Sequence, residues 1–219
     1  MGISIKTLFN EILESIPSTS TISIIGRMRS GKTTFARLLS DYIEEYYKNQ
    51  GFTVFYSVFT PSMIDNLAFI EQYIADNSQD VNILIFDDLS FKLTGNTRHA
   101  REFFNMITRI AHITQSDYNV VFFIGHYSKA ISPFLRASNV VVLTSITHPE
   151  IVSLKELFTL SSLYDFLYYH EIYPRRYIFL IRYHVFERII DFTIESLAKP
   201  LTKREKLSLD TKTETSGFR

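Results

Sequence analysis

One nine-residue stretch constrains this chain more than any other feature. It covers residues 26–34 and reads Gly-Arg-Met-Arg-Ser-Gly-Lys-Thr-Thr. It fits the phosphate-binding pattern G-x-x-x-x-G-K-S/T, in which a glycine-containing turn joins a strand to a helix. The β-branched run 21–25 precedes it and helix-forming residues follow it, as that pattern requires. Two of only seven glycines stand at the two glycine positions, so the stretch predicts a nucleotide-binding α/β domain.

The spacing within this stretch assigns a task to each part of it. Backbone N–H groups of residues 27–32 would surround the β-phosphate, and the positive end of the following helix would face the same anion. Lys32 would bridge the β- and γ-phosphates, Thr33 would turn its hydroxyl toward Mg²⁺, and Thr34 would pack or cap. The predicted cofactors are therefore ATP and Mg²⁺. The predicted nucleotide-binding residues are Gly26, Arg27, Met28, Arg29, Ser30, Gly31, Lys32, Thr33 and Thr34.

A second motif is the apolar run 81–86, which ends in Asp87 and Asp88. Such a run indicates a buried parallel strand that delivers carboxylates to the carboxyl edge of a sheet. Asp87 would hold Mg²⁺ through a water, and Asp88 would polarise the attacking water during hydrolysis of the γ-phosphate. The alternative interpretation is that the two acids form a helix N-cap and a solvated turn.

Four further residues are candidates for contact with the γ-phosphate. The buried strand predicted at 119–124 ends before His126, which could donate a hydrogen bond there or could be an inert loop residue. Phe103 and its apolar neighbours mark a predicted helix that precedes this strand. The polar face of that helix carries Arg98, Arg101 and Arg109. Each could be a solvated charge, or could reach the γ-phosphate of an adjacent subunit in an oligomeric NTPase.

The remaining pattern alternates helices and strands. Helices are predicted at 3–16, from the loop to about residue 49, from Thr60-Pro61 to 76–77, at 132–137 and from Thr147 through the aromatic segment 151–173. Strands are predicted at 52–58 and 139–143, a loop at 91–98, and a hairpin at 177–183 and 186–193. We expect one P-loop ATPase domain over 1–198, with its nucleotide core at 20–195, and a polar, flexible tail over 199–219.

Composition removes several other classes of protein. No cysteine is available for disulfides or thiolate metal sites, and the six histidines are scattered, which makes a structural zinc site improbable. Basic and acidic residues balance at 23 each, so nucleic-acid binding would need a local patch. Arg175, Arg176 and Arg182, interleaved with tyrosines, could form one or simply flank a strand, and we favour the second interpretation. Short apolar runs and the lack of a signal-peptide pattern predict a soluble, cytoplasmic protein with no membrane partner.

The order of these motifs resembles the additional-strand P-loop ATPases, and within them the FtsK–HerA superfamily. The closest likeness is to the small genome-packaging ATPases of archaeal viruses. The resemblance rests on residues 26–33, 83–88 and 121–126, and it extends through the strand at 140–143 and the Pro149-Glu150 helix to the closing hairpin. The family usually places a glutamate where Asp88 stands, and a glutamine or other small polar residue near His126.

The resemblance implies a RecA-like α/β fold, with a mainly parallel sheet between helices and a C-terminal β-hairpin. It also implies a homo-oligomeric ring, by family likeness a hexamer, that hydrolyses ATP with an arginine from a neighbouring subunit. Arg109 is the first position to test for that role. Such rings pull double-stranded DNA into a preformed capsid, so DNA, a capsid or other viral protein and the host cytoplasm are the implied partners and location.

Two other functions stay open at this point. An AAA+-type helicase loader or replication regulator is suggested by Asp87-Asp88-Leu89. Such proteins usually carry a helical lid after the core, whereas a hairpin is predicted here. A small-molecule kinase would need an arginine-rich lid over the donor phosphates, and we identify none in the sequence. The leading hypothesis is an ATP-hydrolysing motor that translocates double-stranded DNA during viral genome packaging.

Overall fold

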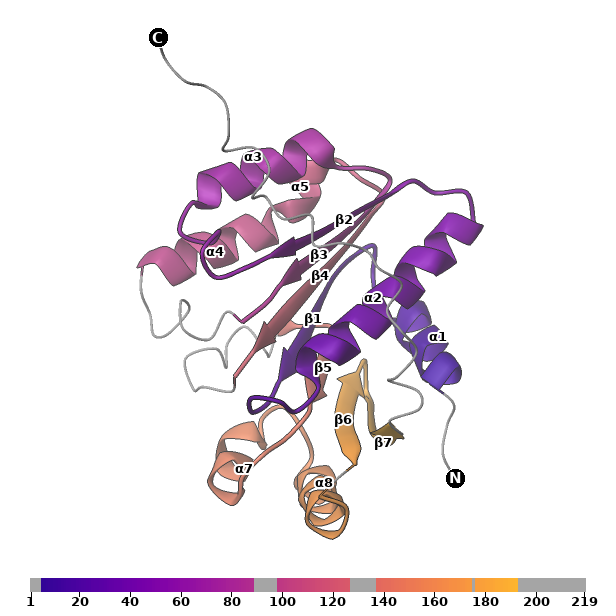
Figure 1. Cartoon of the computed structure of the whole chain (residues 1–219), viewed down its shortest axis with the longest axis vertical. Coiled ribbons are helices and arrows are strands. Elements are labelled where there is room, and N and C mark those ends of the chain that lie inside the picture. The colour runs from indigo at the N-terminus through magenta and orange to yellow at the C-terminus, as the bar shows by residue number, and fades with distance from the viewer. Residues whose placement is uncertain (1–4, 89–97, 127–136, 175, 193–219) are drawn as a thin grey trace.

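The protein is built on one seven-stranded sheet with helices on both faces (Figure 1). The computed structural model describes residues 5–88, 98–126, 137–174 and 176–192. In space the strands follow the order β2-β3-β4-β1-β5-β6-β7. The strands are β1 Thr19–Ile25, β2 Val54–Phe59, β3 Val81–Phe86, β4 Tyr118–Gly125, β5 Val140–Leu143, β6 Tyr177–Tyr183 and β7 Phe186–Phe192.

The first five strands are parallel, and β4 lies between β1 and β3. This extra strand between the loop-bearing strand and the acid-bearing strand defines the additional-strand P-loop architecture, so the predicted fold class is confirmed. All six residues of β3 are buried, because helices cover the sheet on both sides. The carboxyl ends of the parallel strands meet at one edge, which we call the carboxyl edge.

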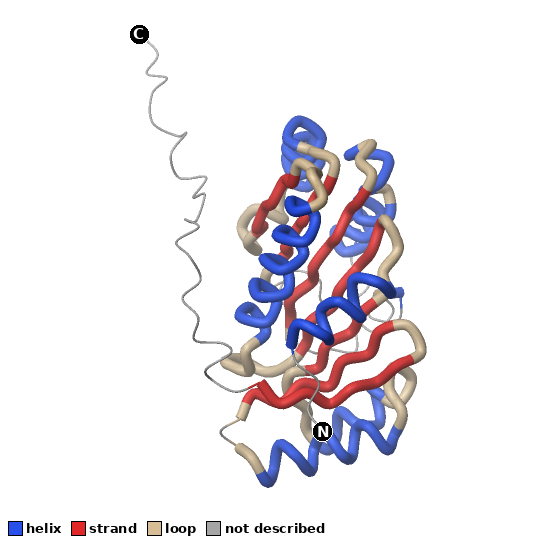
Figure 2. The backbone as a smooth tube through the Cα atoms, turned by 90° about the vertical axis from the view of Figure 1, so that its right-hand side faces the viewer, coloured by secondary structure: helices blue, strands red, loops and turns tan. Residues whose placement is uncertain are grey.

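The helices form two layers, one on each face of the sheet, so that in Figure 2 helices lie in front of the strands and behind them. One layer holds α1 and α2, and the other holds α3, α4 and α5 at one end of the sheet and α7 and α8 at the other end. Their bounds are α1 Ile5–Ser15, α2 Lys32–Asn49, α3 Leu67–Asn77, α4 Arg98–Thr108, α5 Ile110–Thr114, α7 His148–Leu154 and α8 Leu160–Ile172. None of the helices in the described part of the chain is long and apolar enough to cross a membrane.

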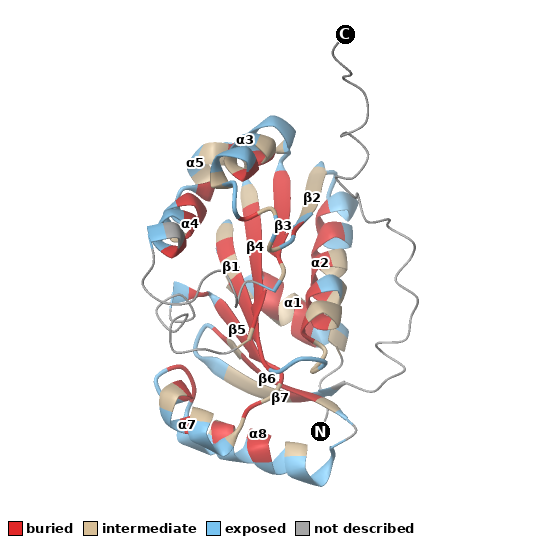
Figure 3. Cartoon of the chain, turned by 60° about the vertical axis from the view of Figure 1, so that its left-hand side comes forward, coloured by how far each residue is buried: buried red, intermediate tan, exposed pale blue. Residues whose placement is uncertain are grey.

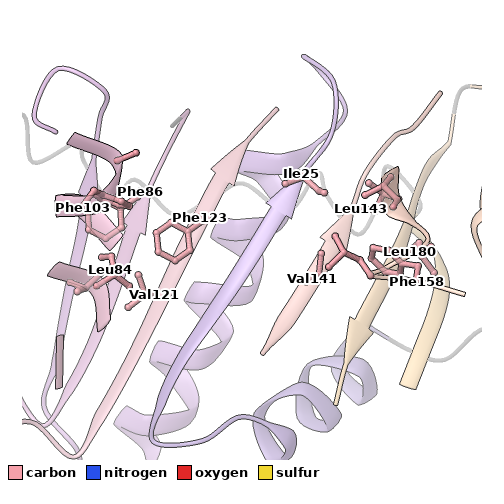
Figure 4. Close-up of a cluster of buried hydrophobic side chains, with 14 of the residues drawn as sticks. Ile25, Leu84, Phe86, Phe103, Val121, Phe123, Val141, Leu143, Phe158 and Leu180 are labelled. Atoms are coloured by element: carbon pink, nitrogen blue, oxygen red, sulfur yellow. The ribbon is translucent and has the colours of Figure 1, made fainter. Parts of the chain in front are cut away.

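Strand alternation divides the core into two clusters, one on each face of the sheet. In β3, Ile83 and Ile85 face α1 and α2, whereas Leu84 and Phe86 face the other layer. Figure 4 shows part of the second cluster, where the rings of Phe86 and Phe123 are stacked with their centroids 5.9 Å apart. Both faces of the central strands are therefore closed, and polar groups concentrate where these strands end.

The predicted C-terminal hairpin is confirmed. β6 pairs antiparallel with β5 on one side and with β7 on the other, so the hairpin extends the main sheet. His184 occupies its turn with φ +52°, a left-handed conformation that a tight hairpin turn requires.

The prediction that Thr60-Pro61 starts a helix is wrong. Residues 61–65 form turns, with Met63 N–H bonded to Thr60 O at 3.0 Å, and the Thr60 hydroxyl pairs with that of Ser62. The helix begins at Leu67, because Asn66 caps it by accepting from the N–H of Phe69 at 3.1 Å. Asparagine is among the strongest capping residues, so Asn66 rather than Thr60 fixes the start.

The continuous helical pattern predicted over 151–173 is interrupted, and α7 and α8 are separate helices. Thr147 opens α7 as expected, because its N–H and hydroxyl both donate to the Glu150 carboxylate. Thr159, with an extended backbone, then starts α8. Its N–H and hydroxyl donate to the carboxylate of Glu187, at 2.9 and 2.8 Å. A contact from β7 thus fixes the break, and local periodicity does not encode it.

Three predicted segments lie largely or entirely outside the described residues. They are the loop at 91–98, the short helix at 132–137 and the tail at 199–219, of which the structure describes only Arg98 and Ala137. The division into a domain over 1–198 and a tail stays a prediction.

Candidate functional site

Both glycines of the loop stand where a side chain has no room. Gly26 follows β1 with φ +156°, and a Cβ added there would lie 2.1 Å from the Thr144 hydroxyl oxygen. Gly31 precedes α2 with φ +87°, and a Cβ there would lie 3.1 Å from the ring of Tyr177 on β6. Glycine is therefore needed at each end of the loop. Its backbone adopts these positive φ angles, and the lack of a side chain lets the loop lie close to Thr144 after β5 and to Tyr177 on β6.

Lys32 is turned inward at the centre of the loop. Its ammonium group donates to the carbonyl oxygens of Gly26 at 2.9 Å and of Arg27 at 2.6 Å. Burial lowers the pKa of Lys32, while the carboxylates of Asp88 and Asp87 act in the opposite direction. A cation is thus held among backbone dipoles at the start of an 18-residue helix, which is an arrangement suited to binding a phosphate.

Thr33 and Asp87 face one another across the carboxyl edge. The Thr33 hydroxyl donates to the two carboxylate oxygens of Asp87 at 3.3 and 3.4 Å, although the residues come from different motifs. Burial raises the pKa of Asp87, and the hydrogen bond from Thr33 partly offsets that shift. A hydroxyl beside a carboxylate offers the hard oxygen ligands that Mg²⁺ prefers, so this pair fits the predicted ion.

Asp88 and His126 lie together at the ends of two adjacent strands. His126 follows β4 directly, and its Nε2 is 3.9 Å from the nearer Asp88 carboxylate oxygen. Asp88 has φ +55°, a left-handed conformation that aspartate tolerates, and its side chain is 50% exposed. The structure therefore brings Lys32, Thr33, both acids and His126 to one edge, with Asp88 open to solvent.

The three candidate arginines lie apart from this group in the single chain. α4 and α5 cross from β3 back to the parallel strand β4, so α4 begins nearer the carboxyl edge than it ends (Figure 1). Arg98 is the first residue of α4, and Arg109 follows its last residue. Arg109 donates to Glu71 of α3 at 3.0 Å, and Arg98 donates to Glu102 at 2.7 Å. Both arginines are exposed, Arg98 on α4 and Arg109 at the junction of α4 with α5, where another molecule can reach them.

Two residues that sequence analysis missed hold the loop from the opposite side. Ser145 accepts a hydrogen bond from the N–H of Arg27 at 2.7 Å, and the hydroxyls of Thr144 and Ser30 lie 2.5 Å apart. Both residues follow β5, which pairs with β1. A signal was present, because polar residues directly follow an apolar strand here as they do at Asp87. Linking them to the loop required knowing that β5 is the neighbour of β1.

No family model matches the sequence, and no curated protein matches it. Solved structures share its fold. The genome packaging NTPase B204 from Sulfolobus turreted icosahedral virus 2, in complex with AMPPCP, aligns with a TM-score of 0.53 and 11% identity over 80% of this chain and 98% of that chain. B204 in complex with ATP-gammaS aligns with a TM-score of 0.52 and 11% identity over 81% and 98%.

The DNA-packaging ATPase B204 from Sulfolobus Turreted Icosahedral Virus aligns over 80% of this chain and 97% of that chain, with a TM-score of 0.50 and 14% identity. At these identities the comparison shows a shared fold. It confirms that the predicted likeness to viral packaging ATPases holds for the architecture of the chain, over about 80% of its length.

Proposed function

We propose that this chain is a Mg²⁺-dependent ATPase that translocates double-stranded DNA as a ring-shaped homo-oligomer, in the packaging of a viral genome. The observation that carries the ATPase part is the meeting of Lys32, Thr33, Asp87 and Asp88 at one sheet edge. The motor part is supported by the fold shared with a DNA-packaging ATPase and by a hairpin that extends the sheet where AAA+ loaders usually carry a helical lid.

Each residue at the carboxyl edge has a separate role in this proposal. Lys32 binds the β- and γ-phosphates. Thr33 directly, and Asp87 through a water, would hold Mg²⁺, which would neutralise phosphate charge. Asp88 orients the attacking water and accepts its proton, since it is the acid that solvent can reach. His126 lies beside Asp88. It would sense the presence of the γ-phosphate by donating a hydrogen bond to it, and it would couple this contact to the Asp88 carboxylate.

The partners follow from the same proposal. The ring would be a hexamer, its substrate double-stranded DNA, and its docking partner a capsid or other viral protein in the host cytoplasm. An arginine of α4, or of its junction with α5, from the adjacent subunit would complete the site. Arg109 is the first to test, with Arg98 as its comparison. Both are exposed, and each pairs with a carboxylate of its own chain. A subunit contact could replace that partner with a group of the neighbouring subunit.

The decisive experiment measures ATP turnover with and without duplex DNA, together with molar mass by light scattering. We expect an oligomer whose turnover rises with DNA and disappears in Lys32→Ala. A strict monomer whose turnover ignores DNA but rises with a small phosphate acceptor would replace the motor with a kinase.

Mixing two inactive proteins tests the arginine in trans. Asp88→Asn subunits keep their arginines, and Arg109→Ala subunits keep their own acids. If Arg109 acts on a neighbour, mixed oligomers recover turnover that neither protein has alone. The same mixture with Arg98→Ala distinguishes the two positions, and full activity of the unmixed Arg109→Ala protein would exclude Arg109.

A further inference from the structure

The outer side of α8 carries a continuous row of apolar and aromatic side chains. Leu160, Tyr164, Tyr168 and Ile172 follow one another at intervals of four, and Tyr169 and Tyr173 lie beside this row. These six residues, which we call the α8 tyrosine surface, are between 40% and 58% exposed. Leu163, Phe166 and Leu167 turn the opposite way and pack against the sheet. Figure 3 shows the exposed side of α8 at the end of the molecule.

An exposed row of this kind indicates an interaction site rather than an ordinary solvated helix. Contiguous apolar patches are uncommon on monomeric proteins, and tyrosine is enriched at the centres of protein interfaces. The charge on α8 favours a protein partner over nucleic acid, because the helix carries Asp165 and Glu171 and no lysine or arginine. The nearby Arg176 is engaged, with its guanidinium 2.5 Å from Asp191 and 4.7 Å above the ring of Tyr173.

The opposite end of the same sheet presents complementary chemistry. The exposed side of α4 and its junction with α5 carries Arg98, Arg101 and Arg109, which we call the α4 arginine face. Beside it runs a groove of about 540 Å³ between α3 and α4. It is lined by apolar residues such as Leu67 and Met106 and by Glu71 and Glu102, the carboxylates that pair with Arg109 and Arg98. Arginine pairs with carboxylates and stacks on tyrosine rings, so this end offers both charge and apolar contacts to α8.

We propose that the α8 tyrosine surface docks on the α4 arginine face and the adjoining α3–α4 groove of a second copy of this chain. α8 bears two acids and no lysine or arginine, whereas the α4 arginine face and its groove bear three arginines and two glutamates, Glu71 and Glu102, so the two surfaces carry net charges of opposite sign. The two surfaces differ and lie at opposite ends of one sheet. The contact is therefore head-to-tail and repeats from copy to copy, as ring closure requires.

This inference deepens the proposed function by naming the surfaces of the subunit contact, and it rests on that proposal for the identity of the partner. The proposed contact also lies near the candidate nucleotide site. Gly31 of the phosphate loop lies against Tyr177, at the start of the strand that follows α8. A neighbour seated on α8 would therefore lie on the side of the molecule that holds the loop.

The test is the molar mass of Tyr164→Glu/Tyr168→Glu, measured by light scattering over a range of concentrations with a non-hydrolysable ATP analogue present. We expect the mass to fall from a multiple of 25.5 kDa to 25.5 kDa, with binding of a fluorescent ATP analogue retained. Tyr46→Glu is the control, because this tyrosine is also exposed, by 40% against 55% and 58% for Tyr164 and Tyr168, but lies on α2. It should assemble like the unmodified protein.

Charge reversal sharpens the assignment of the two surfaces. Asp165→Arg/Glu171→Arg should assemble poorly, as should Arg98→Glu/Arg101→Glu, and all four changes in one chain should restore assembly. Unchanged assembly of the tyrosine variant would overturn the inference and leave the proposed ATPase standing. A protein that is monomeric at every concentration would also overturn it, while Lys32-dependent turnover would still decide the enzymatic proposal. Retained assembly with lost DNA stimulation would assign the surface to nucleic acid instead.

Discussion

The two halves of the carboxyl edge are held together very differently. At β1 and β5, the phosphate loop is closed by hydrogen bonds of 2.5 to 2.9 Å, to Lys32 inside it and to Thr144 and Ser145 beside it. At β3 and β4, the contacts are longer, from 3.3 Å between Thr33 and Asp87 to 3.9 Å between Asp88 and His126. The binding half is preorganised by this chain alone. The half that we assign to hydrolysis is not preorganised in this way. This agrees with our proposal that nucleotide, Mg²⁺ and an adjacent subunit complete the site.

The largest effect should come from Lys32→Ala in the preorganised half. Loss of a buried cation from the phosphate site should weaken ATP binding at least about 100-fold and reduce turnover to background. Isothermal titration and a phosphate-release assay measure the two quantities. Lys48→Ala is the matched control, because Lys48 lies on the same helix and pairs with Glu44 at 2.7 Å, outside the loop. Equal losses in both variants would place the binding site elsewhere.

Asp88→Asn should separate the two halves. Turnover should fall about 100-fold, since the group that accepts a proton from water is lost. ATP affinity should be unchanged or slightly tighter, because a negative charge near the triphosphate is removed. Single-turnover kinetics and equilibrium titration of the same preparation provide the comparison. Retained hydrolysis would assign the base to another residue, and lost binding would show that the halves are not independent.

Ser145→Ala tests whether the contact from β5 positions the loop. Removing the acceptor for the Arg27 N–H should cost about 1 kcal/mol, or about five-fold in the Kd for ATP. Ser145→Thr retains the hydroxyl and should restore most of that affinity. If Ser145 acted only by filling space, the Ala and Thr variants would not differ in their affinity for ATP. An affinity of the Ala variant equal to that of the unmodified protein would mean that the loop holds its shape without β5.

The smallest expected effect is a gain in stability from Asp87→Asn without nucleotide. Burial places the folded pKa of Asp87 above its unfolded value of about 3.9, so the ionised form is destabilising above the folded pKa and the penalty disappears as pH falls through it. Asparagine mimics the neutral form and should raise stability at pH 7 by less than about 1 kcal/mol. Urea unfolding at pH 7 measures the gain, and a loss of stability would contradict the assigned cause.

Sequence reasoning recovered what is encoded locally and missed what depends on neighbours in space. The phosphate loop and the Asp87-Asp88 pair are contiguous patterns with a fixed mechanism, and the resemblance they support supplied the fold class. Thr144 and Ser145 were missed because they reach the loop only through the pairing of β5 with β1. The break between α7 and α8 was missed for a related reason, since Glu187 of β7 fixes it.

The approach of Gly26 to Thr144 also limits how such chains can diverge in evolution. A Cβ at position 26 would meet the backbone nitrogen of Ser145 at 3.0 Å as well as the Thr144 hydroxyl, so shortening residue 144 alone does not make room. Position 26 should therefore stay glycine in every functional descendant. Positions 30 and 144, whose hydroxyls touch, should instead exchange residues as a correlated pair, and an alignment of homologues would show them co-varying.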